Sequence, residues 1–116
     1  MGTWGTGIFE DDLASDIKGN FEDLISSGAS VADATKSSLA EYSDSLTDTD
    51  DGPTVHLALA KLQIQQGALH PDTAKKALEI IESGESLNRW REIGGEDLKH
   101  RQAELEKLKE EIAAKT

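Results

Sequence analysis

The sequence contains no cysteine, which excludes disulfide bonds and every reaction that depends on a thiol. It has no apolar run that approaches the roughly 18 residues needed to span a bilayer. Its beginning has neither the basic residues nor the apolar stretch of a secretory signal peptide. We therefore expect a cytoplasmic protein in a reducing compartment, with no membrane association.

Aromatic and other apolar residues are also scarce. The chain of 116 residues has 36% hydrophobic and 4% aromatic residues, so we expect a single domain over 1–116 with a small core of Leu, Ile and Ala. Large side chains bury the most area each, and the few aromatic residues should therefore anchor this core. These residues are Trp4, Phe9, Phe21, Tyr42 and Trp90.

Basic residues are also few compared with acidic residues. There are 12 Lys and Arg residues and 23 Asp and Glu residues, which gives a formal net charge of −11. The imbalance lies almost entirely in residues 1–54, where the basic residues are Lys18 and Lys36, while residues 55–116 are nearly balanced. Nucleic acid and anionic membrane surfaces both require a basic patch on the protein, so we expect binding to neither. Charge complementarity instead favours a protein partner with a basic surface.

What the chain does contain is helical periodicity. Apolar residues recur at spacings of three and four through most of the sequence, which is typical of amphipathic helices, and Gly or Pro residues separate the segments. We predict an all-α fold, a bundle of five or six helices over 11–115. The predicted helices span 11–27, 30–46, 53–66, 71–83, a short segment at 87–93, and 96–115.

Two of these helices have expected positions in the bundle. Apolar residues cover more than one face of helix 53–66, which predicts a buried, central helix. The last helix carries a heptad-like apolar seam that Arg101 interrupts. This seam either packs on the bundle, which we favour because so small a domain needs its whole core, or forms a homodimer. The seam residues are Leu98, Leu105, Leu108 and Ile112.

The first ten residues show no helical period. They contain three glycines, which permit unusual backbone angles, so we expect an irregular arm over 1–10. The apolar side chains of Trp4, Ile8 and Phe9 should pack on the helical body and hold the arm in place.

The acidic segment TDTDDG, residues 47–52, invites a calcium-binding interpretation, which fails. An EF-hand loop needs oxygen ligands at its first, third and fifth positions, Gly at the sixth and Glu at the twelfth. With Gly52 at the sixth position, Asp51 supplies the one remaining carboxylate at a ligand position. We therefore predict that Asp50 and Asp51 form a turn and cap the following helix, and we expect no metal there.

A second acidic group lies around the start of the first helix. Asp12 and Asp16 are four residues apart and share one helical face. Together with His56 they could bind a divalent metal ion or act as acid and base; the alternative, which we favour, is helix capping and a solvated face. His56 is either a core residue or a neighbour of Asp50 or Asp51, and in the second case it is a candidate for proton transfer.

Motifs of known enzymes are missing from the sequence. It has no HExxH zinc motif, no phosphate-binding loop and no GxSxG nucleophile motif. The glycines of GTWGTG do not match the dinucleotide-binding fingerprint. We therefore expect no cofactor and favour a protein that is not an enzyme.

The chain opens with MGTWGTGIFEDDLASD and continues with DDGPTVHLALAKLQIQQGAL, SLNRW and a charged last helix. These segments resemble a family of small acidic bacterial proteins of unknown function, which opens with M-G-x-W-G-x-G-x-F-x-x-D. That family usually has an Asn shortly after the Phe, where this chain has acids. The resemblance implies a stand-alone domain of bacterial or phage origin and brings no activity with it. It also implies a defining element formed by Trp4, Gly5, Gly7, Phe9 and Asp12.

The function that these observations favour is binding to a basic protein, as an inhibitor, an immunity-type protein or a regulatory partner. Mimicry of nucleic acid by the acidic surface is a variant of this hypothesis. The competing hypothesis is a small enzyme or a metal- or ligand-binding domain with a site around Asp12, Asp16 and His56. The candidate binding residues are Trp4, Asp11, Asp12, Asp16, Asp50, Asp51 and His56.

Overall fold

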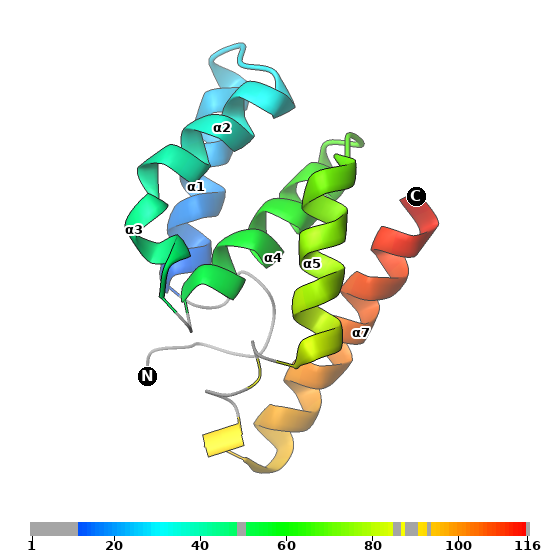
Figure 1. The fold of residues 1–116 in the computed structure, drawn as a ribbon. Helices are drawn as coiled ribbons and strands as arrows, with labels where there is room; N and C mark the ends of the chain where they lie inside the picture. Colours follow the sequence, from blue (N-terminus) through cyan, green and yellow to red (C-terminus); the bar gives the residue numbers. More distant parts are fainter. Residues whose placement is uncertain (1–11, 49–50, 85–86, 88–90, 93, 116) are drawn as a thin grey trace.

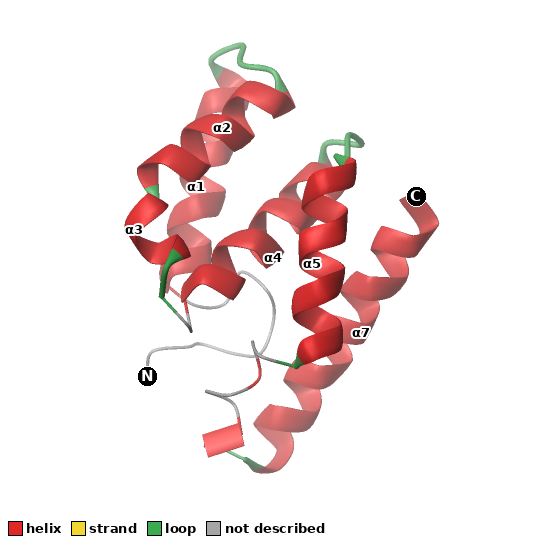
Figure 2. Ribbon diagram, in the orientation of Figure 1, coloured by secondary structure: helices red, strands yellow, loops and turns green. Residues whose placement is uncertain are grey.

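The structure is a computed structural model that describes residues 12–48, 51–84, 87, 91–92 and 94–115. Within these ranges it contains helices and no strand, which confirms the all-α prediction (Figure 2). The helices are α1 (Asp12–Ser26), α2 (Val31–Glu41), α3 (Ser43–Leu46), α4 (Asp51–Gln65), α5 (Pro71–Ser83) and α7 (Gly95–Lys115). The predicted arm over 1–10 lies outside the described residues, as does most of the predicted segment 87–93 with Trp90.

Helix α4 occupies the centre of the molecule, as its apolar pattern predicts. Helices α1, α2 and α3 lie on one side of it and α5 and α7 lie on the other (Figure 1), and α4 contacts all five. The core consequently has two parts. Val55, Ala58, Leu59 and Leu62 of α4 pack with α1 and α2, whereas Leu57 and Ala60 pack with α5 and α7.

Helix α1 presents one apolar face to α4. Ala14, Ile17 and Phe21 are fully buried at spacings of three and four, and Phe21 is the largest buried side chain of the described core. The helix ends at Ser26, and Gly28 follows with a φ of 101°, a conformation that a side chain disfavours. A glycine thus separates this helix from the next, as the sequence pattern predicts.

The predicted helix 30–46 is in fact two helices, so that prediction was wrong in its length. Ser30 caps α2, because its hydroxyl accepts a hydrogen bond of 3.1 Å from the backbone N–H of Asp33. Tyr42 then leaves the helical conformation, with φ −102° and ψ 24°, and α3 begins at Ser43. The bend turns α3 toward the start of α4, with which it packs.

Helix α4 begins at Asp51, two residues before the predicted start at Pro53. The carboxylate that caps it is that of Asp48, whose Oδ1 accepts a hydrogen bond of 2.9 Å from the backbone N–H of Asp51. The Asp48 carbonyl also accepts from the N–H of Gly52 at 3.0 Å. Pro53 fits inside the first turn because that position needs no N–H donor. Asp51 therefore belongs to the helix start, as expected, but Asp48 supplies this cap.

Gly52 allows α3 and α4 to approach each other closely. A Cβ atom at this position would lie 2.8 Å from the backbone carbonyl oxygen of Leu46, which is closer than side-chain carbons come to such atoms. Gly52 is itself buried. The absence of a side chain thus sets the distance between the end of α3 and the first turn of α4.

Gln63 is a buried polar residue that joins three helices. Its side chain is 0% exposed. The Nε2 atom donates to Thr35 Oγ1 of α2 at 2.9 Å and to Thr73 Oγ1 of α5 at 3.1 Å. The Oε1 atom accepts from the backbone N–H of His70, before α5, at 2.9 Å. The amide is thereby satisfied on both its donor and acceptor sides.

Helix α7 packs on the body of the protein, which is the arrangement that we favour for its apolar seam. Leu105, Leu108 and Ile112 are buried with residues of α4 and α5. Arg101, on the same seam, is only 3% exposed. An ion pair of 3.5 Å between Lys61 Nζ and Glu111 Oε1 also joins α4 to α7. The seam is therefore used within the chain; a homodimer through this helix stays a prediction.

The two helical glycines of α1 and α4 should respond oppositely to alanine. A Cβ atom at Gly19 would have no neighbour within 4 Å beyond its own turn of helix, so Gly19→Ala should raise the free energy of unfolding by about 0.5–1 kcal/mol. Gly52→Ala should lower it by about 1–3 kcal/mol, because the new methyl group meets the Leu46 carbonyl. Urea unfolding measures both changes, and equal effects of the two substitutions would contradict the described packing.

Replacing Gln63 by Leu should destabilise the protein by about 1–3 kcal/mol, because the buried Thr35 hydroxyl and the half-buried N–H of His70 lose their hydrogen bonds to the amide. Gln65→Leu, two residues further along α4 at an exposed position, is the matched control. Urea unfolding should show a large loss for the first variant and a small change for the second. If Gln63→Leu left the free energy of unfolding unchanged, these hydrogen bonds would make no net contribution to stability, which would contradict the prediction.

Candidate functional site

The structure places only some of the predicted site residues. Asp16, Asp51 and His56 have described side chains, and Asp12 is the first residue of α1. Trp4, Asp11 and Asp50 lie outside the described residues. The hypothesis of a site at the junction of the arm and the first helix therefore stays a prediction.

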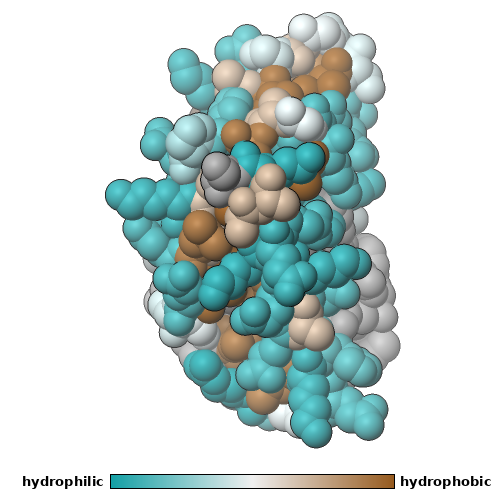
Figure 3. All heavy atoms as spheres, turned by 90° about the vertical axis from the view of Figure 1, so that its right-hand side faces the viewer, coloured by the Kyte–Doolittle hydropathy of each residue, from teal (hydrophilic) through white to brown (hydrophobic). Residues whose placement is uncertain are grey.

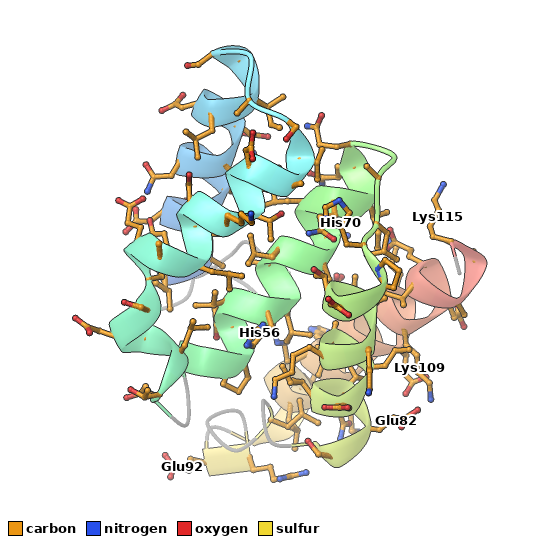
Figure 4. All side chains as sticks on the ribbon, turned by 45° about the horizontal axis from the view of Figure 1, so that its top comes forward. His56, His70, Glu82, Glu92, Lys109 and Lys115 are labelled. Atoms are coloured by element: carbon orange, nitrogen blue, oxygen red, sulfur yellow. The ribbon has the colours of Figure 1, made fainter. Side chains whose placement is uncertain are left out.

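His56 lies in the second turn of α4 and is half-buried. Figure 4 shows it near the start of this helix, with His70 beyond the opposite end. It lines a pocket of about 240 Å³ that is formed by the α3–α4 connection, α4 and α5. The apolar lining residues are Leu46, Pro53 and Ile80, and the others are Thr47, Asp48, Gly52, His56 and Lys76.

We call this cavity the His56 pocket. Its polar residues differ in the hydrogen bonds that they make. The Asp48 carboxylate caps α4 through the backbone N–H of Asp51. The Thr47 hydroxyl donates a hydrogen bond of 3.0 Å to the carbonyl of Asp44, so its proton is already used. Lys76 is exposed on α5 and carries a full positive charge to the pocket edge. The pocket thus combines one capping carboxylate with an imidazole and an ammonium group.

Asp16 lies in a different environment. It is exposed on α1 and is not among the residues that line the His56 pocket. Its charge instead acts on the hydroxyl of Tyr42, at the bend between α2 and α3. Among the residues with described side chains, no group of three His, Asp or Glu residues is placed to hold a metal ion.

Tyr42 has a perturbed environment that the sequence does not reveal. Its hydroxyl accepts a hydrogen bond from Asn20 Nδ2 of α1. Burial has the largest effect on this hydroxyl and raises its pKa above the ordinary value of 10.0. The hydrogen bond from Asn20 acts in the opposite direction, and the negative charges of Glu41 and Asp16 raise the pKa further.

Acidic side chains gather on the α1–α3 side of the molecule. Among the side chains that the structure describes, helices α1 to α3 and their connections carry seven exposed carboxylates, and the lysines there are Lys18 and Lys36. Lys18 pairs with Glu22 at 3.2 Å on the same helix. We call this surface the acidic face. The exposed acids are Asp16, Glu22, Asp23, Asp33, Glu41, Asp44 and Asp48.

The opposite side of the molecule, where α5 and α7 lie, has a different character. Figure 3 shows a largely hydrophilic surface with apolar patches between the polar side chains. A shallow groove of about 470 Å³ runs along α5. Its lining residues are Pro71, Ala74, Lys75, Leu78, Glu79 and Glu82. No helix in the described part of the chain is long and apolar enough to cross a membrane.

Sequence reasoning selected His56 but missed the residues around it. Asp48 stands in the same acidic segment as Asp50 and Asp51. The sequence does not show that its carboxylate accepts the hydrogen bond from the backbone N–H of Asp51 at the start of α4. Lys76 reaches the pocket from α5, and no local pattern marks it among the exposed residues of that helix. The sequence marks Tyr42 only as one of the few aromatic residues expected in the core, and gives no sign of the charges around its hydroxyl.

Because Tyr42 is the one tyrosine, ultraviolet absorbance can follow its ionisation without overlap from another tyrosine. The titration midpoint of the folded protein should lie above 10.0. Asp16→Asn should lower it, since a like charge is removed, and Asp33→Asn, at an exposed site on α2, should leave it unchanged. A midpoint at or below 10.0 would contradict the described environment.

The raised pKa of Tyr42 also contributes to how the free energy of unfolding depends on pH. Folding favours the neutral hydroxyl, so its contribution is fully present below the unfolded pKa of about 10 and is lost as the pH rises through the folded pKa. Unfolding free energies should therefore fall in this alkaline range, and Tyr42→Phe should reduce that fall.

Comparison with known proteins gives one positive result. No curated protein and no solved structure matches the chain. One family matches over residues 2–115, which is nearly the whole chain. The chain belongs to the family described as a domain of unknown function, DUF4259.

Proposed function

We propose that this chain is a non-enzymatic bacterial protein that acts in the cytoplasm and binds a protein partner with a basic surface. Its role is that of an inhibitor, an immunity-type protein or a regulatory partner. The acidic face supports this proposal, because seven exposed carboxylates and two lysines share one side of α4. The charge imbalance of the sequence is thus also an imbalance between two sides of the molecule.

The acidic face has little internal compensation for its charge. The Lys18–Glu22 pair joins side chains that are 39% and 47% exposed, and such surface pairs contribute little. A basic partner would find the remaining carboxylates on three neighbouring helices. Complementary potentials of this kind increase the rate of encounter and disfavour acidic partners.

Tyr42 provides a contact surface for the partner in addition to the charges of the acidic face. It is half-buried at the α2–α3 bend, with its hydroxyl bonded to Asn20 and with Asp16 and Glu41 close enough to affect its ionisation. Tyrosine is enriched in protein interfaces because its ring buries area while its hydroxyl keeps a hydrogen bond. We place the centre of the binding surface here.

Nucleic-acid mimicry is the variant in which the partner is itself a nucleic-acid-binding protein. It predicts binding that weakens steeply as salt is raised, because most of the affinity then comes from charge. The alternative of a ligand-binding domain rests on a different observation, the His56 pocket, which lies at the α3–α4–α5 junction.

Neutralising the acidic face should abolish capture of the partner. The test variant combines Asp16→Asn, Glu41→Gln and Asp44→Asn; its matched control combines Glu96→Gln, Glu106→Gln and Glu110→Gln at exposed positions of α7. Both variants change the net charge equally. Tagged wild-type protein, test variant and control are incubated with bacterial lysate at low and at high salt, and captured proteins are quantified by mass spectrometry.

We expect one stoichiometric basic protein with the wild type and the control, released by high salt, and about tenfold less of it with the test variant. Circular dichroism melting shows whether the three proteins are equally folded. Equal capture by the test variant and the control, or no stoichiometric partner at either salt, would contradict the proposal.

A further inference from the structure

We propose that two copies of this chain form a weak dimer through the groove along α5, with their α5 helices antiparallel across a twofold axis. This inference concerns a different surface from the acidic face and does not depend on the proposed function. It rests on the helical spacing of the groove residues, on the order of their charges along α5 and on the position of the acidic face.

This groove, which we call the α5 groove, lies between two rows of side chains on one helix. Its described lining residues all belong to α5, and within each row they follow one another at a spacing of four. The rows are Pro71–Lys75–Glu79 and Ala74–Leu78–Glu82. Rows with this spacing are the ridges that interdigitate when two helices pack. The α5 groove therefore has the geometry that receives a ridge of a second helix.

The α5 groove exposes a modest apolar surface. Leu78 is half-buried near the middle of the groove, and Pro71 is exposed at the start of the helix. The inner side of Leu78 packs against the buried cluster beneath α5, which holds the side chain in place. Figure 3 shows apolar patches among the polar side chains on this side of the molecule. So small an apolar area predicts a weak, concentration-dependent dimer rather than an obligate one.

The charges along the α5 groove are ordered for pairing with an antiparallel copy. Lys75 and Glu82 are seven residues apart, which is about two turns of helix, so they share one face. Leu78 lies near the midpoint between them. A twofold axis at this midpoint brings Lys75 of each copy opposite Glu82 of the other, and the two Leu78 side chains meet beside the axis. A parallel pairing would bring like charges together instead, which is unfavourable.

Both charges are available for such a pairing. Within the described part of the chain, neither Lys75 nor Glu82 takes part in an ion pair, and both side chains are exposed. Glu79 is the remaining charge of the groove. It follows Lys75 by four residues on the same row, so it lies on the same side of the helix as that ammonium group. The ion pairs between copies therefore use Lys75 and Glu82.

The distribution of charge over the molecule favours this side for self-association. A net charge of −11 opposes the approach of two copies. The acidic face, however, lies on the other side of α4 from α5 (Figure 1), and residues 55–116 carry nearly balanced charge. Pairing through α5 keeps the two acidic faces on the outer sides of the dimer, where solvent and salt screen them from each other. Both acidic faces also stay exposed.

The test is sedimentation equilibrium of the full chain over a range of concentrations. The weight-average mass of the wild type should rise from that of one chain toward that of two. Lys75→Glu and Glu82→Lys should each weaken the dimer about tenfold or more, because each places like charges opposite each other in both pairs. An equimolar mixture of the two variants should dimerise again, since opposite charges then face each other in both pairs. A dimer through another surface gives no such recovery.

Lys76→Glu is the matched control, because it makes the same change of charge at the neighbouring exposed residue, which lines the His56 pocket instead of the α5 groove. It should leave dimerisation almost unchanged. Circular dichroism melting shows whether the variants are folded, as expected for substitutions at exposed positions. The proposal is overturned if the wild type stays monomeric at the highest concentration or if Lys75→Glu dimerises as well as Lys76→Glu, for example through the seam of α7. A mixture of Lys75→Glu and Glu82→Lys that stays monomeric would overturn it as well.

Discussion

The amide of Gln63 is the interaction on which the arrangement of the helices depends. It is fully buried near the end of α4 and donates hydrogen bonds to a hydroxyl of α2 and to a hydroxyl of α5. Burying an amide is costly unless its hydrogen bonds are made, so the fold is favoured only when both threonines and the His70 N–H are in place. The network ties α2 and α5 to α4 at fixed points and so adds to the apolar packing in favouring one register of these helices.

A second constraint shapes the surface near the start of α4. The bend at Tyr42 brings the short helix α3 to α4, and Gly52 lets the Leu46 carbonyl approach without a clash. Asp48 then completes the first turn of α4. The same few residues form one wall of the His56 pocket. The pocket is therefore a consequence of how one helix ends and the next begins.

The sequence predicts the helices well where the apolar periodicity agrees with the Pro and Gly residues that begin and end a helix. Helix α5 begins at Pro71 and ends before Gly84, whose φ is 72°, as its pattern indicates. The break at Tyr42 is not predictable in this way, because the apolar stripe continues past it and the hydroxyl's partner Asn20 lies on another helix. Gln63 looks like part of a polar helix end, and its hydroxyl partners Thr35 and Thr73 lie on two other helices, 28 and 10 residues away in the chain. The pocket around His56 likewise combines three segments, so its composition is a property of tertiary structure alone.

The position of α4 between two core regions divides the molecule into parts with different freedom to change. Substitutions along most of α4 disturb packing on one side or the other, because its apolar residues serve both regions. The described carboxylates of α1 to α3, from Asp16 to Asp44, are exposed to solvent and carry little of the packing. Surface charge can therefore be exchanged with little loss of stability, and the same scaffold can be retuned toward partners of different charge pattern.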